Sequence, residues 1–288
     1  MAKIGVIMRT KDRPILLRRA LQSVTQQTFR DWQLVVVNDG GDPRPVEDLL
    51  ASLDAESQRK ITLVSHPESV GMEAASNVGL SKLKTEYAMI HDDDDSLHPE
   101  FFEKTTSYLD KPPHPRVKGA ITRTTRIIEK LENGTVEVLD QFPFHDWAES
   151  ISLRRMIAQN FIAPICFVFN REACEEVGAF REDLPVLGDW DFNVRFLEKY
   201  EIGIIPEFLA YYHDRSNPDD PNYTTTFSGK LHLHVFYDNF LRNEWLRKDM
   251  EEGKTGRGII ANQAIMFRDS AWEIKKDISK KIDDSNRD

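Results

Sequence analysis

The chain has 288 residues, of which 40% are hydrophobic, enough for one large α/β domain with additions or for two small domains. Its formal net charge of -10 argues against a nucleic acid as the main partner, because no basic stripe is available to neutralise phosphates. The two cysteines support neither a disulfide framework nor a zinc site. Without a signal-peptide core or membrane-spanning run, we expect a cytoplasmic protein, at most peripheral at the inner face of the membrane.

The first hundred residues alternate between strand-like and helix-like patterns. Short apolar runs of strand length occupy residues 3–8, 32–37, 61–66 and 87–91. Apolar residues fall at helical spacing between them, in residues 15–27, 45–53 and 71–83. This repeated βα order predicts a mostly parallel, doubly wound sheet.

Polar residues follow three of these strands, in 9–13, 38–41 and 91–95. In such sheets ligands bind beyond the carboxyl ends of the strands, so we expect the three segments to converge at one crevice. The Asn-Asp-Gly-Gly turn after the second strand is expected to expose the carboxylate of Asp39.

The second half of the chain has a mixed pattern. An antiparallel hairpin is predicted over 126–140, turning on Asn133-Gly134. Further elements are predicted as helices at 151–159, 171–178 and 189–200 and as a strand at 164–170. We divide the chain into residues 1–98, residues 99–217 as the second half of the same domain, and a helical extension at 218–288. The end of this extension is amphipathic and charged, which suggests membrane or protein docking, or the start of a longer chain.

Asp92, Asp93, Asp94 and Asp95 follow the fourth strand directly. They could form a solvated acidic turn at the N-terminus of the next helix. An EF-hand calcium loop fits poorly, because Leu97 stands where that loop needs glycine. The third interpretation is a Mg²⁺ or Mn²⁺ site at Asp92 and Asp94, with the remaining ligands supplied by a diphosphate.

Three segments carry a resemblance to a known family: residues 6–42, the D-x-D region at 71–102 and residues 160–200. They resemble family 2 glycosyltransferases of the GT-A fold, in the family's order over about residues 3–217. The resemblance implies an α/β fold with a Rossmann-like, mostly parallel sheet flanked by helices, a mixed acceptor-side half and a C-terminal helical extension. It makes residues 1–98 the nucleotide-sugar-binding half and 99–217 the acceptor side.

The resemblance also implies roles for single residues. Thr10 and Asp39 would contact the nucleoside, and Asp93 would lie near the ribose or the sugar. Asp94 would be the principal ligand of a Mn²⁺ or Mg²⁺ ion, with Asp92 assisting. His213 matches a histidine that is often close to the metal and diphosphate.

The chain departs from the family pattern at two places. Arg9 and Lys11 replace neutral neighbours of the nucleotide base. Ser76 precedes Asn77, a donor-binding position, where the family commonly carries an arginine. We expect Arg9, Lys11 or Arg13 to supply the missing positive charge near the donor.

Asp189, in the sequence LGDWD, matches the family's general base, whereas an ordinary helix N-cap is the alternative. Asp191 is a rival base or an acceptor contact. Trp190 and Trp147 could stack on an acceptor sugar, although a core role is favoured for both.

The resemblance therefore predicts a metal-dependent, inverting transferase of polysaccharide biosynthesis. The donor would be a nucleotide-diphosphate sugar, with UDP favoured, and the acceptor a hydroxyl of a glycan or lipid-linked glycan. One alternative is a sugar nucleotidyltransferase, but the turn after the first strand lacks the glycine-rich phosphate loop usual in those enzymes. Another is a binding module without catalysis, which would keep the aspartates and lose the base.

Overall fold

The computed structural model describes residues 2–132, 134–215, 223–225 and 231–285. The strands are β1 (Ala2–Thr10), β2 (Trp32–Asp39), β3 (Ile61–His66), β4 (Thr85–Asp92), β5 (Ser96–Leu97), β6 (Val117–Glu132), β7 (Thr135–Phe144), β8 (Phe167–Asn170) and β9 (Glu201–Asp214). The helices of the first half are α1 (Pro14–Thr25), α2 (Pro43–Ala51), α3 (Ala55–Arg59), α4 (Met72–Lys82) and α5 (Phe101–Asp110). The later helices are α6 (Leu153–Ala158), the 3₁₀ turn η1 (Pro164–Cys166), α7 (Arg171–Val177), α8 (Gly188–Lys199), α10 (Leu231–Glu252) and α11 (Arg257–Ser285).

The first half forms the expected parallel sheet, with strand order β3-β2-β1-β4. Strands β1, β2 and β4 are almost continuously buried, as is typical of a parallel sheet covered by helices, whereas the edge strand β3 is only partly buried. In the β1–β4 pairing, Arg9 lies beside Asp92, and in the β1–β2 pairing Thr10 lies beside Asn38. The register therefore brings the three polar strand ends to one edge, as predicted.

The second half continues the sheet in the order β8-β6-β9-β5, with β7 paired to β6. Strand β8 runs antiparallel to both β4 and β6, whereas β6 and β9 are parallel. The hairpin expected at 126–140 is confirmed and slightly longer, because β6 pairs with β7 from Thr124, opposite Phe144, to Glu132, opposite Thr135. Asn133 of the predicted turn lies outside the described residues, whereas Gly134 has the positive φ, 75°, that a tight turn requires. The sheet is mixed, as expected for the acceptor-side half.

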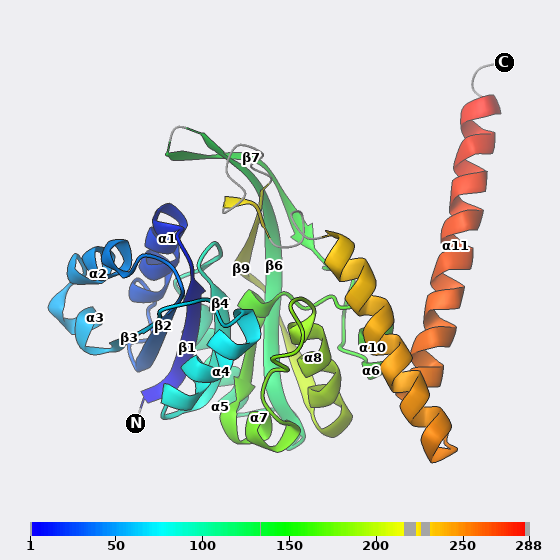
Figure 1. The fold of residues 1–288 in the computed structure, drawn as a ribbon, viewed down its shortest axis with the longest axis horizontal. Helices are drawn as coiled ribbons and strands as arrows, with labels where there is room; N and C mark the ends of the chain where they lie inside the picture. Colours follow the sequence, from blue (N-terminus) through cyan, green and yellow to red (C-terminus); the bar gives the residue numbers. More distant parts are fainter. Residues whose placement is uncertain (1, 133, 216–222, 226–230, 286–288) are drawn as a thin grey trace.

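Helices cover the sheet and continue beyond it at one end. Helix α4 packs on β1 and β2, and α5 packs on β6 and β9. Figure 1 shows α10 and α11 at the opposite end of the molecule from α2 and α3, with α11 extending past the sheet. Within the described residues, no helix combines the length and the apolar character needed to cross a membrane.

Candidate active site

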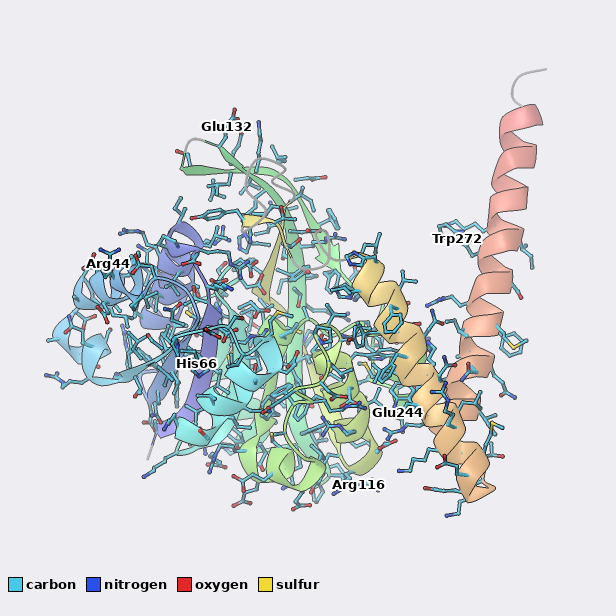
Figure 2. The ribbon with its side chains drawn as sticks, viewed as in Figure 1. Arg44, His66, Arg116, Glu132, Glu244 and Trp272 are labelled. Carbon is cyan, nitrogen blue, oxygen red and sulfur yellow. The ribbon has the colours of Figure 1, made fainter. Side chains whose placement is uncertain are left out.

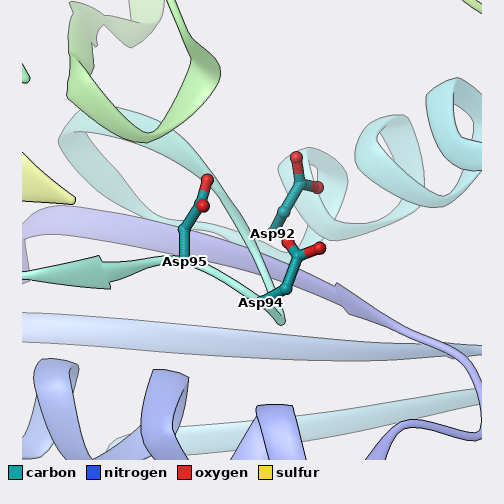
Figure 3. A group of neighbouring side chains, drawn as sticks. All are labelled: Asp92, Asp94 and Asp95. Atoms are coloured by element: carbon teal, nitrogen blue, oxygen red, sulfur yellow. The ribbon is translucent and has the colours of Figure 1, made fainter. Parts of the chain in front are cut away.

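The acidic residues after β4 form a compact group (Figure 3). Asp92, Asp94 and Asp95 each offer a carboxylate oxygen, and these three oxygens lie within 4.8 Å of one another. The sequence singled out Asp92 and Asp94 and missed Asp95. The turn that follows β4 brings Asp95 back toward the other two, a geometry that residue spacing does not reveal.

The third carboxylate, Asp95, is buried and only partly paired. Its Oδ1 accepts a hydrogen bond from the backbone N–H of His213 at 2.9 Å, whereas its buried Oδ2 has no hydrogen-bond partner among the described residues. Burial raises the pKa of this carboxyl well above its ordinary value. A hard divalent cation among these three carboxylates would supply Oδ2 with a partner, so the donor set fits Mg²⁺ or Mn²⁺.

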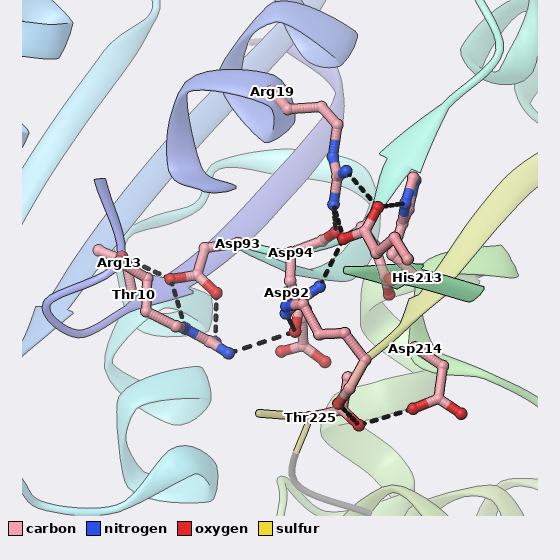
Figure 4. A network of polar contacts seen from close by, with 12 residues as sticks. Thr10, Arg13, Arg19, Asp92, Asp93, Asp94, His213, Asp214 and Thr225 are labelled. Carbon is pink, nitrogen blue, oxygen red and sulfur yellow. Dashed lines mark hydrogen bonds and ion pairs between the residues drawn. The ribbon is translucent and has the colours of Figure 1, made fainter. Parts of the chain in front are cut away.

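Arginines from distant segments neutralise the aspartates (Figure 4). Arg13 pairs with the fully buried Asp93. Arg9 pairs with Asp92. Asp94 receives Arg13 Nη1 at 3.2 Å and Arg215 Nη2 at 2.5 Å on the same oxygen. This countercharge makes it possible for several carboxylates to stand together out of water.

Glu129 on β6 pairs with Arg19 and Arg215, and the sequence analysis missed it. Its buried carboxylate lies 2.7 Å from Arg19 Nη1, 2.8 Å from Arg215 Nη1 and 2.7 Å from His213 Nδ1. Burial alone would raise its pKa, but the hydrogen bonds from His213 and Arg19 lower the pKa to about 2. The β6–β7 pairing shifts register between Ile128 and Glu129, and bulges of this kind re-aim side chains next to active sites.

His213 lies beside the acidic group, but both of its ring nitrogens already have protein partners. Nδ1 contacts Glu129, and Nε2 lies 2.8 Å from Ser96 Oγ. Burial lowers its pKa, which favours the neutral ring. In this arrangement His213 links Glu129 to Ser96 through its two ring nitrogens. Ligation of a metal by His213 remains a prediction.

The residues predicted to contact the donor have different environments. Thr10 Oγ1 donates to Asp93 at 2.6 Å, which fixes the buried carboxylate that Arg13 neutralises. Asn77 on α4 has a different environment. Its amide donates to Phe180 O at 2.8 Å and accepts from Phe180 N at 3.0 Å, so it ties α4 to the segment before α8.

Asp39 is at the predicted strand end but is not exposed, so the expectation of an exposed turn was wrong. Only 8% of Asp39 is accessible, and its carboxylate accepts hydrogen bonds from Ser69 Oγ at 2.6 Å, Val70 N at 2.8 Å and Gly71 N at 3.1 Å. Burial opposes ionisation, but these donors lower the pKa of Asp39. The loop before α4 folds over β2, which the local sequence did not indicate.

Arg9 lies beside Ser76, the position at which the family commonly carries an arginine. Its Nη1 donates to Ser76 Oγ at 3.2 Å and to Met72 O at 3.3 Å, while the other guanidinium nitrogens contact Asp92. A long side chain from β1 thus reaches the small side chain on α4. Of the three candidate replacements, Arg9 has this position, whereas Arg13 turns toward Asp93.

Asp189 opens onto a cavity of about 780 Å³ that Asp92 and Arg9 also line. Its Oδ2 accepts a hydrogen bond from Asn160 Nδ2 at 2.7 Å, and burial raises its pKa. Helix α8 has Leu187 as its N-cap residue, so Asp189 belongs to the first turn and the N-cap alternative is wrong. The half-buried carboxylate is therefore available to the cavity.

Glu73 is a second carboxyl in this cavity that the sequence analysis missed. Gly188 makes its position possible, because a Cβ there would lie 2.4 Å from Glu73 Cδ. Burial raises the pKa of Glu73 to about 7, and the guanidinium of Arg9, 4.0 Å away, opposes that shift. The cavity thus holds one titratable carboxyl on α4 and another on α8.

The two residues after Asp189 point into the protein. Asp191 is 2% exposed and pairs with Arg195 Nε at 2.7 Å, and it does not line the cavity. Trp190 is 1% exposed, and its indole N–H donates to Met156 O at 2.6 Å. Trp190 packs into the core and also lines the cavity, so its role as an acceptor contact stays a prediction, whereas the geometry offers no support for Asp191 as an acceptor contact.

The sequence matches the model of Glycosyl transferase family 2 over residues 5–178. This is more than half of the chain, so the protein belongs to that family. It is a glycosyltransferase, of a class that uses nucleotide-sugar donors. The match ends before Asp189, whose role remains a prediction.

Relatives agree with this assignment. The chain is 25% identical over 205 residues to the uncharacterized glycosyltransferase YwdF of Bacillus subtilis, covering 71% of each chain. It is 26% identical over 212 residues to the amylovoran biosynthesis glycosyltransferase AmsE of Erwinia amylovora, covering 73% of this chain and 74% of AmsE.

Solved structures share the GT-A fold. The mannosyltransferase PcManGT of Pyrobaculum calidifontis, in complex with GDP-Man and Mn²⁺, has a TM-score of 0.58 at 14% identity, over 92% of this chain and 80% of PcManGT. S. aureus TarS 1-349 in complex with UDP-GlcNAc has a TM-score of 0.57 at 18% identity, over 75% of this chain. The matched region spans 59% of that TarS chain.

Proposed function

We propose that this protein transfers a sugar from a nucleotide-diphosphate sugar to a hydroxyl of a glycan or lipid-linked glycan, with inversion at the anomeric carbon. One observation carries the proposal: Asp92 of the acidic group and the carboxylate of Asp189 line the same cavity. A donor held at the aspartates would then present its sugar to a base in that cavity.

UDP is the favoured nucleotide. The TarS structures with UDP and with UDP-GlcNAc support this choice, whereas the PcManGT complex contains GDP-Man. Thr10, Arg13, Asp39 and Asn77 would form the donor side together with Asp93. Because Asp39 already orders the loop at Ser69–Gly71, it would act on the nucleoside through that loop as well as by direct contact.

Asp92, Asp94 and Asp95 would hold a Mn²⁺ or Mg²⁺ ion. When bound, the ion would neutralise the negative charge that grows on the leaving diphosphate. The guanidinium groups of Arg13 and Arg215, which contact Asp94, could turn toward the phosphates of the donor. The Mn²⁺ in the PcManGT complex supports this cofactor class.

Asp189 would accept the proton of the attacking hydroxyl. Asn160 fixes one carboxylate oxygen by a hydrogen bond at 2.7 Å. A base must be ionised and within hydrogen-bond reach of the acceptor, and a raised pKa makes a carboxylate a stronger proton acceptor. Asp191 is a weaker candidate because Arg195 holds its carboxylate away from the cavity.

The amylovoran relative and a teichoic acid poly(glycerol phosphate) polymerase of Staphylococcus epidermidis, 26% identical over 255 residues, support a setting in polysaccharide assembly. The S. epidermidis protein is much longer, and the matched region is 33% of it. We place the reaction in the cytoplasm, at the inner face of the membrane if the acceptor is lipid-linked.

Hydrolysis of UDP-, GDP-, dTDP- and CMP-linked sugars with Mn²⁺ tests the function. A transferase is expected to release the nucleotide slowly from its own donor onto water, and this release should stop with a chelator. A binding module would bind a donor and leave it intact. A nucleotidyltransferase would instead form pyrophosphate and a nucleotide sugar from a sugar phosphate and a nucleoside triphosphate.

A further inference from the structure

Three aromatic side chains lie next to one another in the lining of the cavity beside Asp189. Phe144, at the end of β7, and Tyr212, on β9, are both half-buried and line the cavity, with ring centroids 5.5 Å apart and planes inclined by 32°. The ring of His145 continues the surface, 3.9 Å from that of Phe144. These three rings form an aromatic wall.

The aromatic wall is maintained at a conformational cost. His145 has a φ of 52°, a left-handed value that is unfavourable for a residue with a side chain. Its Nδ1 contacts Phe161 O at 3.0 Å, which sets the direction of the imidazole. Leu187, on the α8 side of the cavity, also has a left-handed φ, 65°. Strained residues of this kind gather at ligand sites.

Helix α10 supplies a second wall. Val235 and Asn239 are one helical turn apart and both line the cavity, and Val235 is 59% exposed. Figure 2 shows Glu244 of α10 beside the α/β domain and Trp272 of α11 away from it. Glu244 pairs with Arg181 Nη1 at 2.6 Å. An ion pair in the middle of α10 thus ties this helix to the segment before α8.

Arg242 connects α10 to α6 and to the start of α8, where Asp189 lies. It is 1% exposed and donates to Ile157 O at 3.2 Å and Ala158 O at 2.8 Å, the carbonyls that end α6. Its guanidinium also lies 4.9 Å from the ring centroid of Trp190, which follows Asp189 directly. Displacement of α10 would therefore disturb the first turn of α8.

We propose that the aromatic wall and α10 form an acceptor subsite for a pyranose ring of a glycan, and that the C-terminal helices are therefore part of the active site. This deepens the proposed function and rests on it. A pyranose has an apolar C–H face that fits an aromatic ring and hydroxyls at its edge that need polar partners. Asn239, whose Nδ2 donates to Val235 O at 3.0 Å, offers an amide on the lining, whereas Asn160 is engaged by Asp189. The cavity volume of about 780 Å³ is in the range of small-ligand sites.

The experiment measures release of the nucleoside diphosphate from the donor that is hydrolysed fastest, with and without added methyl glycosides of glucose, galactose, mannose and N-acetylglucosamine. Wild-type protein should be stimulated by at least one glycoside. In Phe144→Ala the KM for that glycoside should rise about 10-fold at saturating donor, the scale of one lost aromatic contact. Phe208→Ala, on β9 and outside the cavity, is the matched control and should behave as wild type.

A second pair of variants tests α10 without touching the aromatic wall. Val235→Trp would narrow the cavity and should abolish stimulation, whereas Met250→Trp, on the exposed surface of the same helix, should not. Wild-type hydrolysis without stimulation by any glycoside would overturn the subsite, and so would unchanged stimulation in both Phe144→Ala and Val235→Trp. Failure to hydrolyse any donor would instead contradict the proposed function.

Discussion

Asp92, Asp93 and Asp94 can stand side by side at the end of β4 because guanidinium groups from elsewhere in the chain pair with them. Arg9 and Arg13 come from the strand end and turn next to β4, and Arg215 follows β9, far away in the sequence. The sequence showed that a cationic partner was needed and pointed to a metal. It could not identify Arg215 or Glu129, because their approach depends on the pairing of β6 with β9.

The role of Asp189 is tested by Asp189→Asn. Transfer should fall at least about 100-fold, the usual scale of a lost general base, because an amide cannot take the acceptor's proton. Donor and metal affinity, measured by calorimetry, should be unchanged. Because burial raises the pKa of Asp189, wild-type transfer should decrease as pH falls through that raised pKa, where the carboxylate becomes protonated.

Asp191→Asn is the control for this variant. Its effect should be on stability, because Asp191 pairs with Arg195 away from the cavity. Near wild-type transfer in Asp189→Asn together with an inactive Asp191→Asn would show that the wrong carboxylate was chosen. Full activity in both variants would contradict the inverting mechanism.

Glu129 should matter for stability in a pH-dependent way. Its folded-state pKa is lowered from 4.5 to about 2, so its contribution is present above the unfolded value and is lost as pH falls from about 4.5 toward 2. Glu129→Gln should lower the free energy of unfolding by about 3 kcal/mol at pH 7, since it leaves buried cations without a partner. Urea unfolding at several pH values measures this.

The matched control is Glu132→Gln on the same strand, whose side chain is exposed and pairs with Lys130. It should leave the unfolding free energy close to that of the wild type, because exposed ion pairs contribute little to stability. A deficit in Glu129→Gln that stays constant down to pH 2 would disprove the electrostatic account of this cluster.

At the scale of elements, the strand ends were predictable because each βα unit carries its own signal. The apolar runs and the helices between them specify β1 to β4, and the parallel register then sets Arg9 beside Asp92. The fold of the loop before α4 over Asp39 was not predictable, since it depends on three hydrogen bonds from a segment about thirty residues away.

That loop gives a prediction for Asp39→Ala. Ser69 and two backbone N–H groups would lose their acceptor, so the variant should weaken UDP binding and also lower stability by about 1 to 3 kcal/mol. Because donors lower the pKa of Asp39, the stability difference should be full at neutral pH and shrink in acid, below the unfolded pKa. Unchanged UDP affinity in calorimetry would remove Asp39 and its loop from the nucleotide site.

The anchoring of α10 is tested with Arg242→Met. The guanidinium donates to the last carbonyl of α6 and pairs with Asp238. Its loss should lower the free energy of unfolding in urea by about 3 to 5 kcal/mol, the scale of a broken buried ion pair. Arg247→Met, an exposed position on the same helix, is the control and should be near neutral. Equal stability of the two variants would contradict a structural anchor at Arg242.

At the scale of the whole molecule, one sheet brings together residues from both halves of the chain and a helix from the C-terminal extension. The predicted division at residue 98 separates Asp92 from Asp189, and the fold reunites them at one cavity. The sequence placed both residues correctly at element ends, but it gave no sign that α10 lines the same space. Amphipathic spacing on a helix shows that a partner exists and does not say which one.

Calorimetry of UDP with the wild-type protein, in Mn²⁺ and in chelator, tests the central claim most directly. If Asp92, Asp94 and Asp95 hold a cation whose coordination a diphosphate completes, UDP should bind at least about 10-fold more tightly with Mn²⁺, a coupling of about 1.4 kcal/mol. Asp94→Ala should remove that difference. Equal UDP affinity in Mn²⁺ and in chelator, with Asp94→Ala indistinguishable from wild type, would contradict a metal–diphosphate site at the end of β4.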